Sequence, residues 1–296
     1  MANPPIMDEV QIRLGTLSVK RGVAYEPEIK LVNRYFEENP SNLKDQAALI
    51  SRPALSRRTS DVGVGPINIV AYQSGAFDND LFVASGEEIY RVKKFPDTLY
   101  QQNIPDEVTL ITGISVDPDN APAICITKAY TFVADGGILY WIAPDNTNGV
   151  ITTPDDVGIS HLAYINGFVV CVVADSQRFY WIEPNANTID VLNFAEAERL
   201  PDNIVQAMTL GDQVWLFGNK TSEMWYLSGS AEAPFQRVQG RTFDRGSWEG
   251  TAVRVGDAVI LVGEDGKVYS VEGGPTRISY NGLEERLRKA IQQQGM

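Results

Sequence analysis

A short pattern recurs along this chain of 296 residues and constrains its fold more than any other feature. Each copy has an apolar stretch, a tight turn, a run of strand-forming residues, a second turn and a strand that ends in Tyr. The second turn and its Tyr recur at Gly86 to Tyr90, Gly136 to Tyr140, Ser176 to Tyr180, Thr221 to Tyr226 and Asp265 to Tyr269. Successive Tyr residues are 40 to 50 positions apart. This period is typical of β-propeller blades, because a single small sheet must stack on its neighbours to bury both faces.

The first turn of each copy supports the same repeat. Hairpin-forming residues follow the apolar stretch at Asp78 to Asp80, Lys128-Ala129, Asn166-Gly167, Gly211-Asp212 and Gly256-Asp257. We therefore expect an all-β fold, a β-propeller over residues 61–280 with about five recognisable blades. Five blades followed by a change of period leave two alternatives, an open array or a ring that a partner completes.

The first 60 residues differ from the repeats, since they are rich in Pro, Asn and charge. We expect an irregular N-terminal arm over residues 1–60 that docks onto other subunits. Its candidate subunit-contact residues are Arg13, Lys20, Arg21, Arg34, Arg52, Arg57 and Arg58. The alternative for the cluster between Arg52 and Arg58 is a solvated loop.

Residues 281–296 change from the strand pattern to a helical one. Asn281 is a good N-cap with Glu284 three residues later, and Leu283, Leu287 and Ile291 recur at helical spacing. A short C-terminal amphipathic helix is therefore expected over these residues.

The charge of the chain argues against a protein that grips nucleic acid. Lys and Arg number 25 against 38 Asp and Glu, so the net charge is −13. A protein that binds a phosphate backbone tightly needs the opposite sign. An acidic wall suits transient passage of double-stranded DNA, because it repels the polyanion and prevents adhesion.

The two cysteines predict no disulfide framework. Cys125 and Cys171 each lie in an apolar strand, where a thiol behaves as a small hydrophobic group. The N-terminus carries no signal-peptide pattern, and no apolar run has the length of a membrane span. These features predict synthesis in a reducing cytoplasm.

The residue types needed for catalysis or metal binding are scarce, so we expect no enzyme, no cofactor and no metal site. His161 is the only histidine and lies in an apolar strand pattern, which favours a structural role. The acidic clusters at Asp117 to Asn120 and Asp145 to Gly149 lack the spacing of a calcium loop and are interpreted as turns.

A carbohydrate site remains open as an alternative. Many carboxylates are available for a glycosidase pair, although the Asp box typical of sialidases does not repeat. The five tryptophans are compatible with a sugar platform or with packing between blades, and their recurrence with the blades favours packing. They are Trp141, Trp181, Trp215, Trp225 and Trp248.

One segment is distinctive beyond its period. Trp215 to Gly218 is followed by Thr221 to Gly229, which reads TSEMWYLSG, then by Pro234 to Arg237 and by Gly246. This order resembles the packaged-DNA stabilization proteins of short-tailed bacteriophages, which form the tail nozzle or hub. The stretch from Leu31 to Leu55 is similar to the opening of that family. Known members extend further beyond the point that corresponds to Met296.

The resemblance implies a structural virion protein in a phage tail. It implies a hexameric ring below the portal and its adaptor, which retains packaged DNA and passes it during genome ejection. In such a ring we expect the arm and the rim loops to contact neighbouring subunits, and carboxylates near the axis to prevent DNA adhesion. The alternative is a carbohydrate-binding or glycan-hydrolysing propeller of a receptor-recognition component, with a pocket where two carboxylates and a Trp converge.

Overall fold

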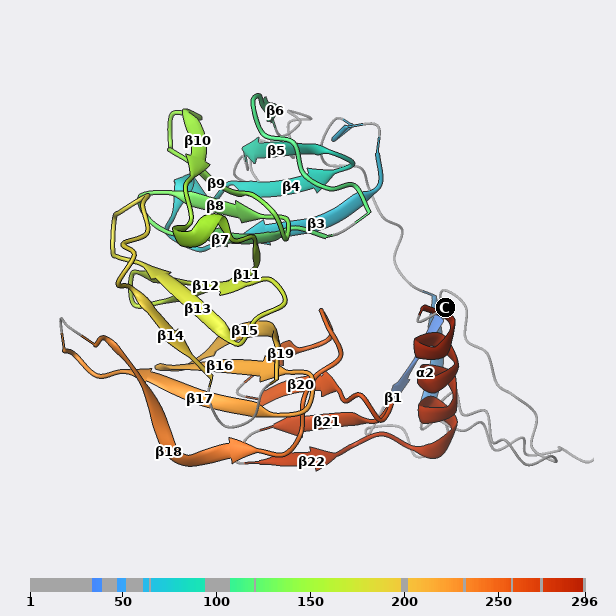
Figure 1. Cartoon of the computed structure of the whole chain (residues 1–296). Helices are drawn as coiled ribbons and strands as arrows, with labels where there is room; N and C mark the ends of the chain where they lie inside the picture. The colour runs from blue at the N-terminus through green and yellow to red at the C-terminus, as the bar shows by residue number, and fades with distance from the viewer. Residues whose placement is uncertain are drawn as a thin grey trace, which may run out of the picture.

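Five four-stranded antiparallel sheets make up most of the molecule (Figure 1). The structure is a computed structural model, and it describes residues 34–38, 47–51, 61–63, 65–93, 107–119, 121–197, 202–230, 233–256, 258–271 and 274–294. Each sheet is built from four consecutive strands, and we number these sheets as blades 1 to 5 in chain order. The predicted all-β propeller is therefore confirmed.

The strands of the blades have the following bounds. Blade 1 contains β3 (Ile67–Tyr72), β4 (Leu81–Ser85), β5 (Glu88–Lys93) and β6 (Glu107–Ile111). Blade 2 contains β7 (Ala123–Ile126), β8 (Thr131–Ala134), β9 (Leu139–Ile142) and β10 (Asn148–Ile151). Blade 3 contains β11 (Ile159–Ile165), β12 (Phe168–Val173), β13 (Arg178–Ile182) and β14 (Phe194–Glu196). Blade 4 contains β15 (Ile204–Leu210), β16 (Gln213–Gly218), β17 (Ser222–Leu227) and β18 (Phe235–Phe243). Blade 5 contains β19 (Val253–Val255), β20 (Ala258–Val262), β21 (Val268–Val271) and β22 (Pro275–Arg277).

The blades follow one another along an arc, with the first strand of each blade innermost (Figure 1). β3 contacts β7, β7 contacts β11, and β11 contacts β15. In the described part of the chain every strand pairs only within its own sheet, so no exchanged strand joins blade 5 to blade 1. Blades 1 and 5 lie at opposite ends of the arc (Figure 1).

The up-and-down order of the strands creates two rims. Because neighbouring strands are antiparallel, the turn between the second and third strands lies at the same rim as the connector to the next blade. We call this side the connector rim. The opposite side, which holds the turns after the first and third strands, is the hairpin rim.

A cross-strand pair marks the face that each blade turns toward the preceding blade, which we call its front face. The repeated Tyr residues pair with the second strand as Val83–Tyr90, Val133–Tyr140, Cys171–Tyr180 and Leu261–Tyr269. Blade 4 differs, because the residue opposite Leu216 is Glu223 and not an aromatic. The interpretation of Tyr226 as the fourth repeat Tyr was wrong, since Tyr226 pairs with Gln213 and its side chain is exposed.

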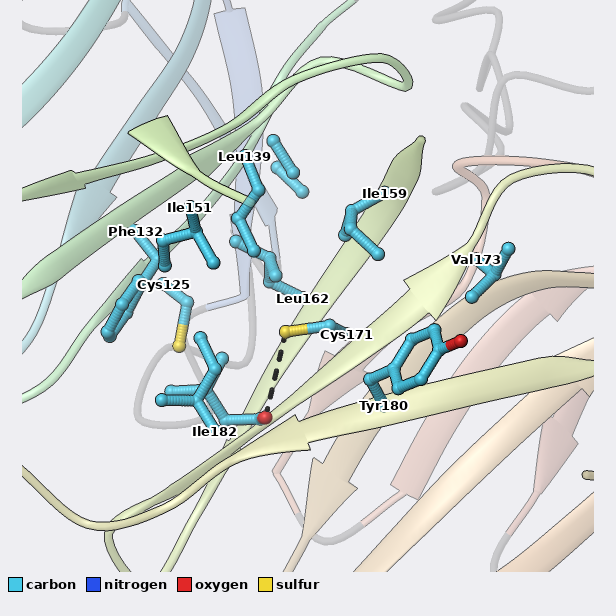
Figure 2. Close-up of a cluster of buried hydrophobic side chains, with 13 residues drawn as sticks. Cys125, Phe132, Leu139, Ile151, Ile159, Leu162, Cys171, Val173, Tyr180 and Ile182 are labelled. Atoms are coloured by element: carbon cyan, nitrogen blue, oxygen red, sulfur yellow. Dashed lines mark hydrogen bonds between the residues drawn. The ribbon is translucent and has the colours of Figure 1, made fainter. Parts of the chain in front are cut away.

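Buried apolar side chains fill the seams between blades. Figure 2 shows the seam of blades 2 and 3, where Cys125 and Leu139 from one sheet meet Cys171 and Tyr180 from the next. Both cysteines are free and buried, which confirms their expected role as small hydrophobic groups. The Cys171 thiol donates to the carbonyl oxygen of Val169 at 3.7 Å.

Buried polar side chains fix the blades and their turns at the rims. Asp80 in blade 1 accepts a bond from Arg91 Nε at 2.7 Å, and the same guanidinium donates to the carbonyl oxygen of Pro144 in blade 2. Asp202 Oδ2 accepts bonds from the backbone N–H groups of Lys220 and Thr221, which holds the turn of blade 4. A buried carboxylate that accepts several donors is stabilised in place, since its desolvation is offset by those bonds.

The expected C-terminal helix is present as α2 (Asn281–Gln294) and lies against blade 5 at the connector rim (Figure 1). Glu284 is buried and accepts bonds from Ser279 Oγ and Arg277 Nε. These bonds lower the pKa of the Glu284 carboxyl, the bond from Ser279 most of all. Gly266 has a positive φ of 71°, and a Cβ there would lie 2.6 Å from Arg288 Cγ, so the close approach of α2 needs glycine.

The N-terminal arm is described only in part. β1 (Arg34–Glu38) and β2 (Ala47–Ser51) form a two-stranded antiparallel sheet. The rest of residues 1–60 lies outside the described residues. The predicted boundaries of the arm, at residues 1–60, and of the propeller, at residues 61–280, stay predictions.

Candidate functional site

His161 lies on β11, opposite Val172 of β12. Burial lowers the pKa of its imidazole to about 4, so the side chain is neutral at pH 7. The neighbouring Ser160 hydroxyl donates to the carbonyl oxygen of Val172 at 3.5 Å. A serine nucleophile would instead donate its proton to the imidazole. This arrangement supports the structural role that the sequence predicts for His161.

The thiols are also poorly placed for chemistry. Burial raises the pKa of the Cys125 thiol to about 12 and raises that of Cys171 as well. A reactive cysteine needs a thiolate near neutral pH, which burial in an apolar seam opposes. Among the described residues there is no group of three His, Cys, Asp or Glu side chains that could hold a metal ion.

Four of the five tryptophans pack between blades. Trp141 packs against the cluster of blades 2 and 3, while Trp181 and Trp225 are buried between blades 3 and 4. Trp215 is buried between blades 4 and 5. The predicted packing role is confirmed for these four residues.

A groove of about 430 Å³ opens between the outer strands of blades 3 and 4. Its lining comes from β14, β17 and β18 and comprises Phe194, Ala195, Glu196, Trp225 and Arg237. β18 bulges beside it, because the register with β17 shifts between the partners of Glu223 and Trp225. Sequence reasoning missed this groove, since it depends on how two outer strands from different repeats are placed.

The groove brings together the two carboxylates and the Trp that were predicted for a glycan site, but both carboxylates have guanidinium partners. Glu223 lies beside it and accepts a bond from the Trp225 indole N–H at 3.1 Å, so two carboxylates and a Trp do converge. Each carboxylate, however, has a guanidinium partner. Arg178 Nε and Nη2 donate to Glu196 Oε1 at 3.0 and 2.9 Å, and Arg237 lies 3.5 Å from Glu223. The arrangement fits ligand recognition better than hydrolysis, which needs one carboxyl group free to donate a proton.

Exposed carboxylates lie on both rims of the blade array. On the connector rim they come from the second turns of blades 1, 3 and 5 and from the connectors that follow blades 1, 2 and 4. Those of the connector rim are Glu87, Asp119, Asp155, Asp156, Asp175, Asp244, Glu249 and Glu264. Those of the hairpin rim are Asp78, Glu107, Asp145, Glu183, Asp190 and Asp212. The innermost strands β3, β7, β11, β15 and β19 contain no Asp or Glu, so the exposed carboxylates of the blades lie at the rims and not on these strands.

The two ends of the arc present apolar surface. On β3 of blade 1 the side chains of Val70 and Tyr72 are 53% and 50% exposed. On β19 of blade 5 those of Val253 and Val255 are 49% and 54% exposed. Both strands are innermost in their blades, a position that neighbouring blades cover elsewhere in the array.

The predicted subunit-contact residues cannot be placed against these surfaces. Arg34 is the first residue of β1, and only its backbone is described. The other six lie outside the described residues: Arg13, Lys20, Arg21, Arg52, Arg57 and Arg58. Their role stays a prediction.

A family model described as "Bacteriophage P22 Gp10, beta-propeller" matches residues 76–295. The chain belongs to this family. The family consists of phage stabilization proteins, so membership makes the chain a phage structural protein and indicates a component of the virion tail. The resemblance inferred from residues 215–246 is thereby confirmed.

One solved structure has a similar fold at a TM-score of 0.50. Hsv2 of Kluyveromyces lactis is similar with a TM-score of 0.50 and 8% identity, over 87% of this chain and 89% of that one. BamB from Moraxella catarrhalis has a TM-score of 0.43 and 11% identity, over 74% of this chain and 62% of that one. At 8% identity the likeness to Hsv2 concerns the fold alone. No curated protein matches the chain.

Within the described residues, no helix combines the length and the apolar character that crossing a bilayer requires.

Proposed function

We propose that this protein is a nozzle or hub subunit of a short phage tail. Six copies form a ring below the portal and its adaptor, retain the packaged DNA and pass it to the host during ejection. The observation that carries the proposal is the family match over residues 76–295, which includes most of the five blades and helix α2.

The blade array suits a part that must bear load. Each seam buries large side chains against the next blade, so the blades resist sliding past one another. Arg91 adds a polar link across the first seam through its bond to Pro144, 2.6 Å long. The array therefore acts as a stiff wedge that can stand beside identical wedges around an axis.

The connector rim is the surface that we assign to the DNA path. A negatively charged wall repels the phosphate backbone, so DNA slides past it without adhering. Salt bridges neutralise part of this rim in blade 5, where Arg245 and Lys267 both lie within 3.3 Å of Asp265. The exposed carboxylates of the other turns and connectors keep the rim acidic.

Reconstitution with the portal and adaptor tests the assembly. The expected result is a complex in which electron microscopy counts six copies around the portal axis. A chain that remains monomeric and never joins the portal and adaptor at physiological salt would contradict the proposal.

A pair of charge-reversal variants tests the DNA path. We expect Glu87→Lys, Glu249→Lys and Glu264→Lys together to slow DNA release from assembled particles, with a delay that shrinks as salt rises. The matched control reverses three exposed carboxylates of the hairpin rim, Glu107, Glu183 and Asp212, and should leave release unchanged. Equal effects of the two triple variants would remove the rim from the DNA path.

The groove between blades 3 and 4 favours a second candidate, glycan recognition by a tail component. Its aromatic edge at Phe194 and its exposed guanidinium at Arg237 are groups that bind acidic sugars. A glycan array should then show binding that Arg237→Ala abolishes and Arg241→Ala, outside the groove lining, retains. An array without any signal would eliminate this candidate.

A further inference from the structure

The outer strand of blade 3 leaves one backbone edge unpaired. In the described part of the chain, β14 is the last strand of its sheet and pairs with β13 alone. The N–H of Ala197, just after β14, donates to the carbonyl oxygen of Gln177, just before β13. Because inward and outward groups alternate along a strand, the N–H and C=O groups of Phe194 and Glu196 point away from β13. We call these groups the free edge, and an edge of this kind can accept another strand.

An exposed apolar turn leads into the free edge. Val191 and Leu192 are 64% and 78% exposed, and Phe194 is 41% exposed. Asp190 holds this turn in shape, because its Oδ1 accepts a bond from the N–H of Leu192 at 2.9 Å and its carbonyl oxygen accepts one from the N–H of Asn193 at 3.0 Å. Large apolar side chains that lie this close together on the surface mark an interaction site.

The free edge also borders the groove of about 430 Å³ between blades 3 and 4. Arg237 on β18 lines the other side of this groove, and its side chain is 41% exposed. Among the described residues its guanidinium has one ionic contact, with Glu223 Oε1 at 3.5 Å, which is longer than a typical hydrogen bond. The donors of Arg237 are therefore available to a carboxylate that enters the groove.

The carboxylates of the groove do not compete for this role. Glu223 is only 3% exposed, so a ligand in the groove meets the guanidinium of Arg237 before that carboxylate. Glu196 on the other side is held by two bonds from Arg178, at 3.0 and 2.9 Å. The charge that the groove presents to a ligand is therefore positive at Arg237.

We propose that the free edge and the groove bind an extended peptide segment of a partner protein that carries an acidic side chain. The segment adds to blade 3 as a fifth strand, beside β14. Its apolar side chains pack on Leu192 and Phe194, and its carboxylate pairs with Arg237.

A peptide accounts for more of this surface than a sugar does. An acidic sugar can use the ring of Phe194 and the guanidinium of Arg237, but it has no main chain to pair with β14. A peptide uses these two groups, the free edge and the apolar turn together. The surface therefore favours a peptide over the glycan candidate.

Titration with short peptides tests strand addition. The first probe is a capped peptide of alternating Val and Thr with one central Glu, and two further forms carry N-methyl groups on one or the other alternate set of backbone amides. The unmethylated peptide should bind the intact chain in calorimetry, and one of the methylated forms should bind at least about tenfold more weakly, because its donors no longer reach β14. No binding of the first peptide, or equal binding of all three, would overturn the inference.

Arg237→Ala tests the charge pairing, and Arg241→Ala is its control on the same strand, outside the groove lining. Arg237→Ala should weaken binding of the Glu peptide at least about tenfold and affect much less a peptide with Gln in place of Glu. Arg241→Ala should change neither affinity. Arg237 also contacts the buried Glu223, so circular dichroism checks that the variant is folded. Equal losses for the two peptides in a folded variant would overturn the pairing.

Leu192→Ser tests the apolar turn. It should weaken binding of the Glu peptide about threefold or more, because an apolar contact is lost. Val150→Ser is the matched control, since Val150 is 59% exposed on β10, the outer strand of blade 2. Equal affinities of the two variants would overturn the part assigned to the turn.

Hydrogen exchange identifies the source of the segment, and at this point the inference rests on the proposed tail role. The N–H groups of Phe194 and Glu196 should exchange freely in the isolated chain and be protected in the assembled tail, whereas that of Ala195 is protected in both. Free exchange at Phe194 and Glu196 in the assembled tail would overturn the assignment to a tail partner. Protection that arises when the isolated chain self-associates would make a second copy the occupant and also overturn it.

The results separate the inference from the proposed function. Peptide binding by a chain that never joins the portal and adaptor supports the inferred groove and contradicts the tail role. An assembled tail without peptide binding and without protection of the free edge contradicts the inference and leaves the tail role standing. Acidic glycans that bind where the peptides do not would assign the groove to a sugar and overturn the inference.

Discussion

Two neighbouring seams join similar sheets by different means. Between blades 3 and 4 an aromatic cluster fills the interface, with the Phe179 ring 5.2 Å from Trp225 and 6.0 Å from Phe235. Between blades 4 and 5 the cluster around Trp215 is joined by a polar bridge. Gln206 Nε2 donates to the carbonyl oxygen of Ala252 at 2.8 Å, and the N–H of Ala252 donates back to Gln206 Oε1 at 2.9 Å.

The difference follows from the innermost strands. β15 has seven residues and packs along β11, whereas β19 has only three. A short strand offers little apolar surface near the propeller axis. The backbone groups of Ala252, which precedes β19, therefore need hydrogen-bond partners outside their own sheet. His161 and Gln206 occupy the same register position, one residue after a bulge, in β11 and β15. The same register position therefore holds a partly buried imidazole in one seam and a side chain that bridges two blades by hydrogen bonds in the next.

The largest expected effects come from the aromatic residues of the two seams. Phe179→Ala and Trp215→Ala should each lower the free energy of unfolding by about 3 to 5 kcal/mol, because both leave a cavity in a buried interface. Urea denaturation measures both. If Trp215→Ala costs less than about 1 kcal/mol, the apolar part of the seam between blades 4 and 5 contributes little and the comparison fails.

A milder substitution serves as the control for size. Trp215→Phe should cost less than about 2 kcal/mol, since a phenyl ring fills most of the space of the indole. The Trp215 indole N–H has no hydrogen-bond partner among the described residues, so its removal loses no bond.

The polar bridge gives the next largest effect. Gln206→Leu should cost about 2 to 3 kcal/mol, because it leaves the N–H and carbonyl groups of Ala252 buried without partners. The exposed Gln239→Leu is the matched control and should change the free energy by less than about 0.5 kcal/mol. Similar costs for both variants would show that the bridge does not hold this seam.

The sequence predicts the strands of these seams better than their contacts. Bounds for β3, β15 and β16 follow from apolar runs between turn residues, because a two-residue period and a turn signal are local properties. The bridge from Gln206 to Ala252 spans 46 positions and depends on the stacking of two sheets, which no local pattern encodes. The groove at Phe194 and Arg237 was missed for the same reason.

His161, which occupies the register position of Gln206 in the seam of blades 3 and 4, makes the free energy of unfolding depend on pH. The His161 imidazole has a lowered pKa in the folded protein, about 4 against about 6.5 when unfolded, so only the unfolded chain binds its proton between these values. The stability that His161 contributes is therefore present above pH 6.5 and is lost as pH falls toward 4. We expect a loss of about 1 to 2 kcal/mol, less than a fully buried group would give because the side chain is partly exposed.

Two proteins must be compared, because carboxylates also titrate toward pH 4 and affect the stability of both. Urea midpoints of the natural chain and of His161→Leu are compared from pH 7 to pH 4. The midpoint should fall more steeply in the natural chain. Parallel curves would mean that His161 is protonated in the folded seam and that the comparison with Gln206 does not hold.

The smallest expected effect tests which Tyr residues belong to the structural repeat. Tyr140 holds the repeat position opposite Val133, whereas Tyr226 pairs with Gln213 outside it. Tyr140 is buried in the seam of blades 1 and 2 and donates its hydroxyl to the carbonyl oxygen of Ser115 at 3.0 Å. Tyr226 is exposed and donates to Gln236 Oε1 at 3.1 Å on the surface. Tyr140→Phe should cost about 1 kcal/mol, and Tyr226→Phe should cost close to nothing, because water replaces an exposed partner. Blade 4 keeps its front face with Glu223 opposite Leu216, so its seam does not depend on a Tyr. Urea denaturation measures both losses in the free energy of unfolding. Equal losses would mean that Tyr226 is buried like the repeat Tyr residues, which would contradict the register of β17.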